Sequence, residues 1–489
     1  MFRKKQAKQK PDAVASALIT IAGKENVLYL KEDLLSYECD GYTLERGMPR
    51  AVVFVRNTQH VADVVKQLNA LGVPYIARGA GTGLSGGATP RGGEIIISLV
   101  RMKRLLELDL ENRQAVVEPG YINLKLTQSI SDKGYYYAPD PSSQYACTIG
   151  GNVAENSGGA HCLKYGVTTN HILGLEVVLP SGEMMEIGKS GVPDQPGYDL
   201  LGLLTGSEGT LGIVTKITVN ILKNPEGKKT ALAYFDDIDD ASQAVSDIIA
   251  TGIIPAALEM MDEIAIEGVE ASAYPVGHPR DIAAFLLIEV DGIQAGIDDQ
   301  IDDILTVCKS NHVRDVKVAQ DEAERSMWWA NRKMGFGAMG AISPDYLVQD
   351  GVIPRTRLPE VLTRITEISR KYELRIANIF HAGDGNLHPL ILFDARVPGE
   401  SDRASKAGSE CLQVCADVGG SITGEHGVGI EKSAEMRFIF SDEEMRAQTD
   451  IRHVFNPDDL LNPGKLFPEP GRCVEVKHNE KKEAAASIN

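Results

Sequence analysis

The chain has 489 residues, a formal net charge of −18 at pH 7 and 43% hydrophobic residues. That length exceeds what one hydrophobic core normally supports, so we expect two or more domains. The acidic charge balance disfavours nucleic acid as a partner, because contact with phosphate groups requires a basic face.

The sequence contains no recognisable membrane span or secretory signal. No stretch of about 20 apolar residues is present to cross a bilayer, and the basic opening MFRKKQAKQK lacks the apolar core of a signal peptide. We therefore expect a cytoplasmic protein, with peripheral attachment to a membrane as the alternative. Segments 1–12 and 470–489 are rich in charged or small residues, which predicts disorder.

The cysteines do not form a disulfide framework, because they are odd in number and scattered. Cys411 and Cys415 have the i,i+4 spacing of one helix face and could hold a metal, although buried free cysteine is the commoner case. The absence of a CxxC repeat predicts no iron–sulfur cluster in this chain. The seven cysteines, which fit a reducing compartment, are Cys39, Cys147, Cys162, Cys308, Cys411, Cys415 and Cys473.

The first predicted elements are a strand, a helix and a second strand. Residues 51–55 have the pattern of a buried strand, and Asn57 or Thr58 is expected to cap a helix that Gly72 ends. The apolar positions that share one face of this helix are Val61, Val64, Val65, Leu68 and Leu71. The strand 73–78 then leads into a glycine-rich loop, and GGEIIISLV predicts another strand after it.

The loop IARGAGTGLSGGATP concentrates glycine directly after the second strand. Such a density of glycine indicates backbone that passes close to another group, and the usual candidate is a phosphate. The dinucleotide-binding GxGxxG motif needs its glycines between a strand and a helix, and a P-loop needs Gly-Lys-Ser/Thr, but neither context is present. Two interpretations remain: successive N–H groups that form an anion-binding concavity, or a flexible surface turn.

Two further loops of small and hydroxylated residues follow, at 139–159 and 203–215. Between them, HILGLEVVLPSGEMMEI has the pattern of a hairpin that turns at Ser181-Gly182. The small side chains of these loops would let the backbone close around a long ligand.

The order of RGAGTGLSGG, PDPSSQYACTIGGNVAENSGG, YGVTTNHILGLEVVLPSGE and GSEGTLGIVT resembles the FAD-binding module of the vanillyl-alcohol oxidase or PCMH type. From about residue 40 to 467 the sequence is similar to the FAD-linked D-2-hydroxyacid dehydrogenase family, which includes the flavoprotein subunit of glycolate oxidase and D-lactate and D-2-hydroxyglutarate dehydrogenases. The first loop reads TGLSGGA at 82–88, without the histidine that attaches FAD covalently in some members of the superfamily. We therefore expect dissociable, non-covalent FAD.

The resemblance also assigns residues to the cofactor. It implies that the FAD phosphates contact Gly79, Gly81, Thr82, Gly83, Ser85 and Gly86. It implies that the rest of the cofactor contacts Asp140, Ser143, Thr148, Gly151, Asn152, Gly158 and Ile213.

From about residue 226 the sequence changes to longer strand and helix units with fewer glycines. TALAYF precedes a helix expected near 239–252, and AAFLLIEV precedes one near 294–309 that leads into VRDVKVAQ. This alternation predicts an α+β fold with an antiparallel sheet covered on one side. The domains we expect are an N-terminal helical lead-in at 1–45, a PCMH-type FAD-binding domain at 46–225, a substrate or cap domain of the FAD-linked oxidase C-terminal type at 226–467, and a disordered tail at 468–489.

Two histidines flank a turn in the second half. RIANIFHAGDGNLHPLILF reads as a hairpin with His381 and His388 at the base of its loop, where Cβ atoms on facing strands lie about 5 Å apart. In GGSITGEHGVGI, Glu425 precedes His426 and could complete a two-histidine, one-carboxylate set suited to Zn, Mn or Fe. The alternative for each histidine alone is an ordinary hydrogen-bonded residue, but the combination favours a metal site.

The family resemblance covers these motifs, because HxGDGNLH and GEHGxG match the metal and active-site motifs of the D-2-hydroxyacid dehydrogenases. It implies metal ligands at His381, His388 and Glu425, with His426 as the catalytic base. Asn386 would orient the site or contact substrate. Arg332, in SMWWANRKMGFGAMGAISPDY, would grip the substrate carboxylate with two hydrogen bonds, and its alternative is a solvated arginine on a helix.

The implied reaction is oxidation of a 2-hydroxy acid to the 2-oxo acid, with metal-assisted deprotonation by His426 and hydride transfer to FAD. Relatives specific for hydroxyglutarate carry a lysine for the distal substrate carboxylate at the position that aligns with Val348. An apolar residue there would leave a second carboxylate unpaired, so we expect glycolate first and D-lactate second. The alternative is a catalytically silent FAD-binding subunit of a glycolate oxidase complex. Electrons would leave to a quinone, a cytochrome or an iron–sulfur subunit, with an accessory flavoprotein subunit as a further partner.

Overall fold

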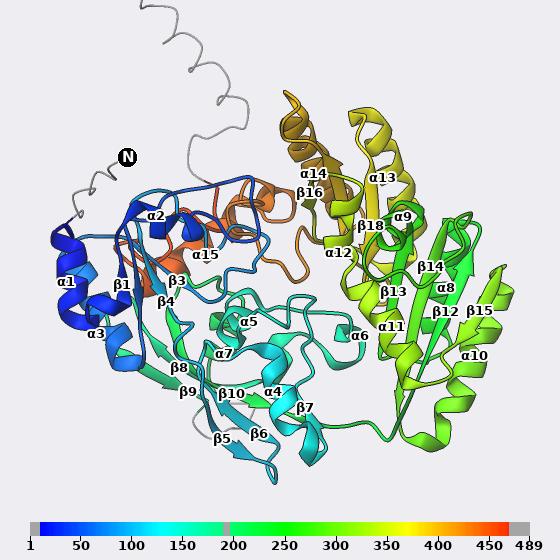
Figure 1. The fold of residues 1–489 in the computed structure, drawn as a ribbon, viewed down its shortest axis with the longest axis horizontal. Coiled ribbons are helices and arrows are strands. Elements are labelled where there is room, and N and C mark those ends of the chain that lie inside the picture. Colours follow the sequence, from blue (N-terminus) through cyan, green and yellow to red (C-terminus); the bar gives the residue numbers. More distant parts are fainter. Residues whose placement is uncertain (1–9, 189–195, 469–489) are drawn as a thin grey trace, which may run out of the picture.

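The computed structural model describes residues 10–188 and 196–468 of the chain. Most of the two segments expected to be disordered, 1–12 and 470–489, lies outside the described residues, and so does Cys473. Two groups of sheets lie side by side, one built by the first half of the sequence and one by the second (Figure 1). Helix α1 (Ala13–Ala22) precedes the first sheet, and α2 (Lys31–Leu34) lies in the sequence between the first two strands of that sheet.

The first sheet follows the predicted strand, helix and strand order. Its strands, in spatial order, are β1 (Val27–Leu28), β2 (Ala51–Phe54), β4 (Ile95–Ser98) and β3 (Tyr75–Arg78). The last three are parallel, and helix α3 (Thr58–Ala70) connects β2 to β3 with Asn57 as its N-cap. Leu71 was expected on the buried face of this helix, but it lies at the C-cap and is 43% exposed, because the chain has already turned toward Gly72 there.

A second, antiparallel sheet carries the later glycine-rich loops. Its order is β5 (Leu105–Asp109), β6 (Gln114–Val117), β10 (Ile213–Asn220), β8 (Ile172–Val178) and β9 (Met184–Ile187). The predicted hairpin at Ser181-Gly182 is confirmed, since β8 pairs with β9 across that turn. The remaining elements of this half are α4 (Asn123–Ile130), β7 (Tyr135–Tyr136), α5 (Ile149–Glu155), α6 (Cys162–Tyr165), α7 (Leu200–Leu204) and β11 (Leu222–Lys223).

The second half forms a seven-stranded sheet, here called the cap sheet. In spatial order it contains β15 (Asp315–Val318), β12 (Gly227–Phe235), β14 (Ala284–Gly292), β13 (Ala257–Asp262), β18 (Ile376–Phe380), β20 (Pro389–Phe393) and β16 (Asp345–Val348). Every neighbouring pair is antiparallel, as expected. A short antiparallel pair consists of β17 (Gly351–Val352), which follows β16, and β19 (Asn386–Leu387), which lies between β18 and β20 in the sequence.

The cap sheet is covered on both faces, so the expectation of a cover on one side was wrong. One face packs against α8 (Ile238–Ala250), α10 (Ile297–Ser310), α13 (Leu358–Tyr372) and α14 (Glu400–Asp417). The other face packs against α9 (Glu263–Glu270), α11 (Glu322–Lys333) and α12 (Gly335–Ala338). The physical signal was the nearly continuous apolar run of β14, whose residues from Ala284 to Asp291 are all buried. Such runs indicate strands buried on both faces.

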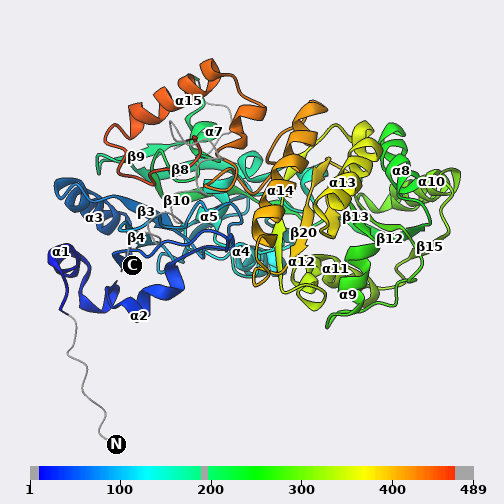
Figure 2. The same ribbon diagram turned by 90° about the horizontal axis from the view of Figure 1, so that it is seen from above.

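The last described segment returns to the first half of the molecule. Helix α15 (Asp442–Phe455) lies beside the first two sheets in both views (Figures 1 and 2). The backbone of Tyr75 in β3 donates to the carbonyl of Leu460 at 2.8 Å and accepts from the N–H of Asn462 at 2.8 Å. Leu461 is fully buried in the core around β2, β3 and β4. The predicted domain boundaries at 225/226 and 467 stay a prediction. Residues near 460 nevertheless pack against the first sheet, so the two halves are not simply consecutive segments of the chain.

Candidate active site

A large cavity opens where the glycine-rich loops converge. It contains about 1680 Å³ of empty space, including its open mouth. The first loop contributes residues 79–84, and the two later loops contribute parts of 141–157 and 204–214. Lys333, Phe336, Glu425 and His426 line the same cavity from the second half of the chain. The cavity therefore joins the predicted cofactor loops to the predicted catalytic residues.

The first glycine loop presents free backbone donors to this cavity. Between Gly79 and Gly87 no backbone N–H donates to a protein acceptor within the described residues. Gly81 has φ +72°, and a Cβ on Gly83 would meet nothing closer than Asp40 Oδ2 at 4.0 Å. Successive unpaired N–H groups of this kind form an anion-binding concavity. The loop therefore fits the phosphates of a dinucleotide.

One close approach explains why glycine is needed at the start of the loop. A Cβ on Gly79 would lie 2.4 Å from Thr148 Oγ1, which is too close for any side chain. Thr148 is the N-cap of α5 and its hydroxyl accepts the N–H of Gly151 at 3.2 Å. The first loop and the helix of the second loop are thus held in direct contact at the cavity wall.

Most of the predicted cofactor residues line the cavity. Those that do are Gly79, Gly81, Thr82, Gly83, Ser143, Thr148, Gly151, Asn152 and Ile213. Four others are not among the lining residues: Ser85, Gly86, Asp140 and Gly158. Asp140 instead pairs with His161 at 2.9 Å and with Lys333 at 3.0 Å, and a Cβ on Gly158 would lie 2.6 Å from Glu425 Oε2. The assignment of all thirteen residues to FAD stays a prediction.

The predicted metal ligands lie together at the end of the cavity. His381 directly follows β18 and His388 directly precedes β20, so the hairpin places their rings 5.1 Å apart, centroid to centroid. Glu425 Oε1 lies 3.4 Å from His381 Nε2 and 3.2 Å from His388 Nε2. Ligand atoms of these three residues all lie within 4.8 Å of one another. The structure therefore brings the three residues together as the sequence predicted.

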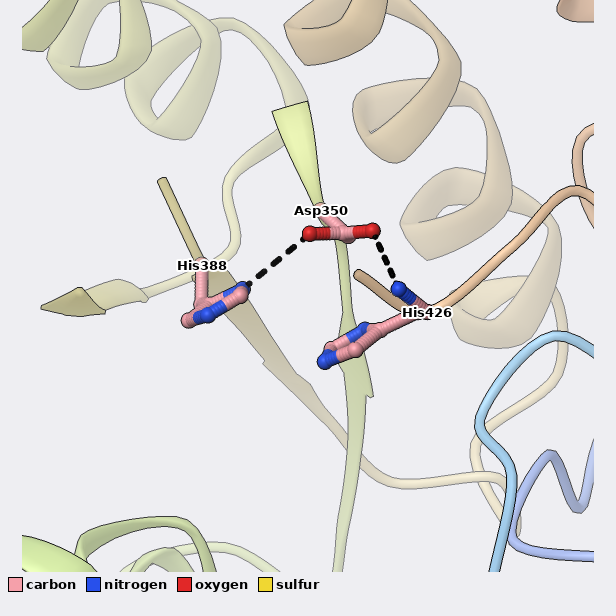
Figure 3. A group of neighbouring side chains, drawn as sticks. All are labelled: Asp350, His388 and His426. Atoms are coloured by element: carbon pink, nitrogen blue, oxygen red, sulfur yellow. Dashed lines mark hydrogen bonds and ion pairs between the residues drawn. The ribbon is translucent and has the colours of Figure 1, made fainter. Parts of the chain in front are cut away.

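A buried carboxylate lies behind each histidine. Glu259, in β13, contacts His381 Nδ1 at 2.8 Å, and Asp350 Oδ1 lies 3.7 Å from His388 Nδ1 (Figure 3). With Nδ1 facing a carboxylate, each histidine directs Nε2 toward Glu425. Metal-ligating histidines commonly have such partners, which fix the ring orientation and tautomer.

Asp350 also holds the backbone around Glu425 and His426. Its Oδ2 accepts the hydroxyl of Thr423 at 2.6 Å and the backbone N–H of Glu425 at 3.1 Å and of His426 at 2.8 Å. The rings of His388 and His426 are stacked, with centroids 4.9 Å apart and an interplanar angle of 5°. Figure 3 shows these two rings below the Asp350 carboxylate. Asp350, His388 and His426 form a second group whose ligand atoms lie within 4.8 Å of one another.

The electrostatics of the cluster favour an anionic carboxylate. Burial would raise the pKa of Glu425, but the nearby imidazoles of His381, His388 and His426 lower it well below its usual value. Burial lowers the pKa of His388, so this imidazole is held in the neutral form that binds metals. Burial would also lower the pKa of His381, but the Glu259 carboxylate raises it well above its usual value.

The donor set fits a divalent cation. Both ring nitrogens of His388, Oε2 of Glu425 and Nδ1 of His426 are buried and have no hydrogen-bond partner within the described chain. Buried polar atoms are normally satisfied, and two of these atoms, Nε2 of His388 and Oε2 of Glu425, belong to the predicted ligand residues, so the cluster calls for an additional group. Two imidazoles and a carboxylate are ligands that Zn, Mn and Fe accept.

Arg332, the predicted carboxylate anchor, is buried rather than exposed to the cavity. It is 3% exposed, does not line the cavity, and pairs through Nη2 with Glu259. Its Nε remains buried without a hydrogen-bond partner. Asn386, the residue expected to orient the site, is buried against the loop that carries Glu425, since a Cβ on Gly424 would lie 2.7 Å from its side chain.

Val348 does not face the cavity. It is 6% exposed and packs in the apolar cluster that contains Trp328 and Trp329. The expectation that this position faces a distal substrate carboxylate therefore has no support in the geometry, because the side chain belongs to the core between the cap sheet and its second layer of helices.

Three site residues were missed by the sequence analysis: Glu259, Asp350 and Lys333. The first two lie in largely apolar stretches, ALEMM and YLVQDGVIP, and both are fully buried. An isolated carboxylate in a buried strand is costly unless it has a partner, and this was the available signal. Lys333 follows Arg332 in α11 and lines the cavity, and nothing in the sequence distinguished it from a solvated helix lysine.

The fold and site together define a two-part flavoprotein. The chain matches the model described as "FAD binding domain" over residues 49–188 and that described as "FAD linked oxidases, C-terminal domain" over residues 224–466. Two solved structures share the fold. The structure of p-cresol methylhydroxylase has a TM-score of 0.78 and 19% identity over 94% of this chain and 97% of that chain. The structure of 4-ethylphenol oxidase from Gulosibacter chungangensis has a TM-score of 0.77 and 18% identity over 95% of this chain and 100% of that chain. The fold is thus the vanillyl-alcohol-oxidase type, as predicted.

Curated relatives show the family. The chain is 47% identical to glycolate oxidase subunit GlcD of Escherichia coli strain K12 over 92% of this chain and 90% of that protein. It is 39% identical to GlcD of Bacillus subtilis over 94% and 97%, and 33% identical to D-lactate dehydrogenase of Anaerostipes hadrus over 86% and 90%. The chain belongs to the FAD-linked oxidoreductase family that contains these glycolate oxidase subunits and D-lactate dehydrogenases. Among the described residues, no helix is long and apolar enough to cross a membrane.

Proposed function

We propose that this chain oxidises a small D-2-hydroxy acid, with glycolate as the first substrate and D-lactate as the alternative. The observation that carries the proposal is that Glu425 and His426 line the same cavity as the first glycine loop. A cofactor seated along that loop would reach the histidine and carboxylate cluster. The names of the relatives support both substrates, since they include glycolate oxidase subunits and a D-lactate dehydrogenase.

Two bound groups would supply the redox and Lewis-acid chemistry: FAD would be the acceptor for the electron pair of the α-carbon, and a divalent ion, Zn, Mn or Fe, would lower the pKa of the substrate hydroxyl. His381 and His388 would hold the ion through Nε2, and Glu425 through a carboxylate oxygen. FAD would be held without a covalent bond, because the first loop contains no histidine.

His426 would take the hydroxyl proton on Nε2. Its Nδ1 is enclosed and without a partner in the described chain, whereas Nε2 lies 3.6 Å from Glu425 Oε1 and so faces the cluster. Asp350 holds this residue in place through its backbone N–H. A general base placed in this way contributes about 10²- to 10⁴-fold to the rate of proton transfer.

Arg332 would bind the substrate carboxylate with the donors that Glu259 does not use, and Asn386 would orient the substrate through its unpartnered Oδ1. After oxidation, the electrons would pass to a partner. The word "subunit" in the relatives' names supports a partner chain. That partner would be an iron–sulfur or accessory flavoprotein subunit, with a quinone or cytochrome as the alternative acceptor. We place the protein in the cytoplasm, with peripheral membrane attachment as the alternative.

Anaerobic titration of the purified flavoprotein with a panel of 2-hydroxy acids tests the proposal. Glycolate or D-lactate should bleach the flavin, and D-2-hydroxyglutarate should do so poorly. Mild acid should release the flavin into the supernatant, which would establish that it is not covalently bound. A flavin that no 2-hydroxy acid bleaches would identify a catalytically silent FAD-binding subunit instead.

A further inference from the structure

The loop that carries Glu425 and His426, Thr423–Gly429, is here called the catalytic loop. Two buried carboxylates from different parts of the chain hold it. Asp350 binds its first half, as described above. Glu208 binds its second half: Oε1 accepts the N–H of Val428 at 2.6 Å, and Oε2 accepts the N–H of Gly429 at 2.6 Å. Burial raises the pKa of Glu208, and the two N–H groups act against this by favouring its anionic form.

Glu208 belongs to the cofactor side of the molecule. It lies between α7 and β10, and it lines the cavity together with its neighbours Ser207 and Gly209. Its φ is +51°, a left-handed conformation that a residue with a side chain rarely adopts. The surroundings maintain this conformation, since the N–H of Glu208 donates to Ala154 at 2.7 Å and its carbonyl accepts from Asn462 Nδ2 at 2.8 Å. Unfavourable backbone of this kind concentrates at functional sites.

The first glycine loop makes a second connection to the same region. The carbonyl of Ser85 accepts the N–H of Ile430 at 3.0 Å and of Glu431 at 3.1 Å, directly after the catalytic loop. A Cβ on Gly429 would lie 2.1 Å from the Ser85 oxygen, so the two backbones touch. The catalytic loop is thus bonded to the Glu208 loop, and the two residues that follow it are bonded to the first glycine loop.

We propose that Glu208 is a positioning residue that couples occupancy of the cofactor cavity to the geometry of Glu425 and His426. A dinucleotide that orders the loop around Glu208 also orders the amides that follow His426. By linkage, cofactor binding then raises the affinity of the cluster for a divalent ion, and ion binding raises cofactor affinity by the same factor. The inference rests on the proposed function only for the roles of Glu425 and His426.

Glu208→Gln tests the contact, because glutamine has nearly the same volume but only one oxygen to accept the two N–H groups. Glu94→Gln is the matched control. Glu94 is 4% exposed and accepts two consecutive N–H groups, from Arg91 at 3.0 Å and from Gly92 at 2.8 Å, but it does not line the cavity. Both variants therefore remove the same kind of contact from the first half of the molecule.

Hydrogen exchange of the holoenzyme gives the direct readout. The amides of Val428 and Gly429 should exchange about tenfold faster in Glu208→Gln than in wild type, and at the wild-type rate in Glu94→Gln. Calorimetric titration with Mn²⁺ or Zn²⁺ gives the second readout. Wild-type protein freed of FAD should bind the ion about tenfold more weakly than the FAD-loaded protein, and in Glu208→Gln this ratio should fall toward one.

Unchanged exchange at Val428 and Gly429 in Glu208→Gln would overturn the proposal, and so would a wild-type ion affinity that is the same with and without FAD. If Glu208→Gln does not fold, the wild-type comparison of FAD-loaded and FAD-free protein decides alone. A different outcome is that FAD binding strengthens ion binding but no 2-hydroxy acid reduces the flavin. That result would contradict the proposed function and leave the role of Glu208 intact.

Discussion

The cofactor cavity is lined mainly by backbone and small side chains, whereas the cluster of His381, His388, Glu425 and His426 is built from large polar side chains. The cavity wall consists of backbone amides and small side chains, and at Gly79 even one added carbon would overlap Thr148. The cluster consists of ionisable side chains, and its two histidines are placed by buried partners, Glu259 and Asp350. An added side chain in the cavity wall should therefore weaken FAD binding, and removal of a side chain from the cluster should slow flavin reduction.

Removal of a metal ligand tests the second half of this comparison and should have the largest effect. His388→Ala should lower the rate of flavin reduction by 2-hydroxy acids on the order of 10⁴-fold, because loss of Lewis-acid assistance costs several kcal/mol in the transition state. FAD should stay bound, since His388 does not line the cavity. Stopped-flow reduction, flavin absorbance and elemental analysis for metal measure the three quantities.

The exposed His453→Ala, in α15, controls for loss of an imidazole and should match wild type in all three measurements. His388→Ala protein that reduces its flavin at the wild-type rate would show that the metal is structural or absent. The chemistry would then rest on His426 and Arg332.

Removal of the base should have the next largest effect and should separate it from the ligands. His426→Ala should slow flavin reduction by about 10²- to 10⁴-fold while metal and FAD both stay bound, because His381, His388 and Glu425 remain. Turnover alone would not distinguish this variant from His388→Ala, so metal content is the deciding measurement. Loss of metal from His426→Ala would instead favour the second ligand group, Asp350, His388 and His426.

Addition of a side chain tests the first half of the comparison. Gly79→Ala should weaken FAD binding about tenfold, because the new methyl group displaces Thr148 Oγ1 and its contact with Gly151, while ion affinity should change less. Gly340→Ala, at an exposed glycine with open space around its Cα, is the matched control. Equal FAD affinity in Gly79→Ala and wild type would mean that the loop adapts and that the close contact is not required.

The same contrast explains what the sequence could predict. The glycine loops and the histidine hairpin are local patterns, so their positions followed from short stretches of sequence. Glu259 reaches His381 across 122 positions of the chain, and such pairing has no local signature. The second cover of the cap sheet was missed for a related reason: the segment of α11 was considered only for Arg332, although its Trp328 and Trp329 are buried against the sheet.

The contact between the two halves of the molecule at His161 gives the prediction with the smallest effect, on the pH dependence of stability. His161, from the cofactor half, lies 2.9 Å from Asp140 and 3.4 Å from Glu289 in β14 of the cap sheet. Burial alone would lower the pKa of His161, but these two carboxylates raise it from 6.5 to about 10. Folded protein therefore keeps a proton that the unfolded chain releases above about pH 6.5.

The sign follows from this difference. The stabilisation is complete below the unfolded pKa and is lost as the pH rises toward 10, so the free energy of unfolding should fall by roughly 1–2 kcal/mol between about pH 7 and about pH 9, after allowance for solvent screening. Denaturant unfolding of wild type and His161→Gln across this range measures it. The difference between the two proteins isolates His161 from the buried tyrosines and cysteines, which titrate in both. Parallel pH profiles would show that the junction is held by its other contacts, among them the pair of Lys164 with Asp291, and that the two halves of the site are joined without a titrating histidine.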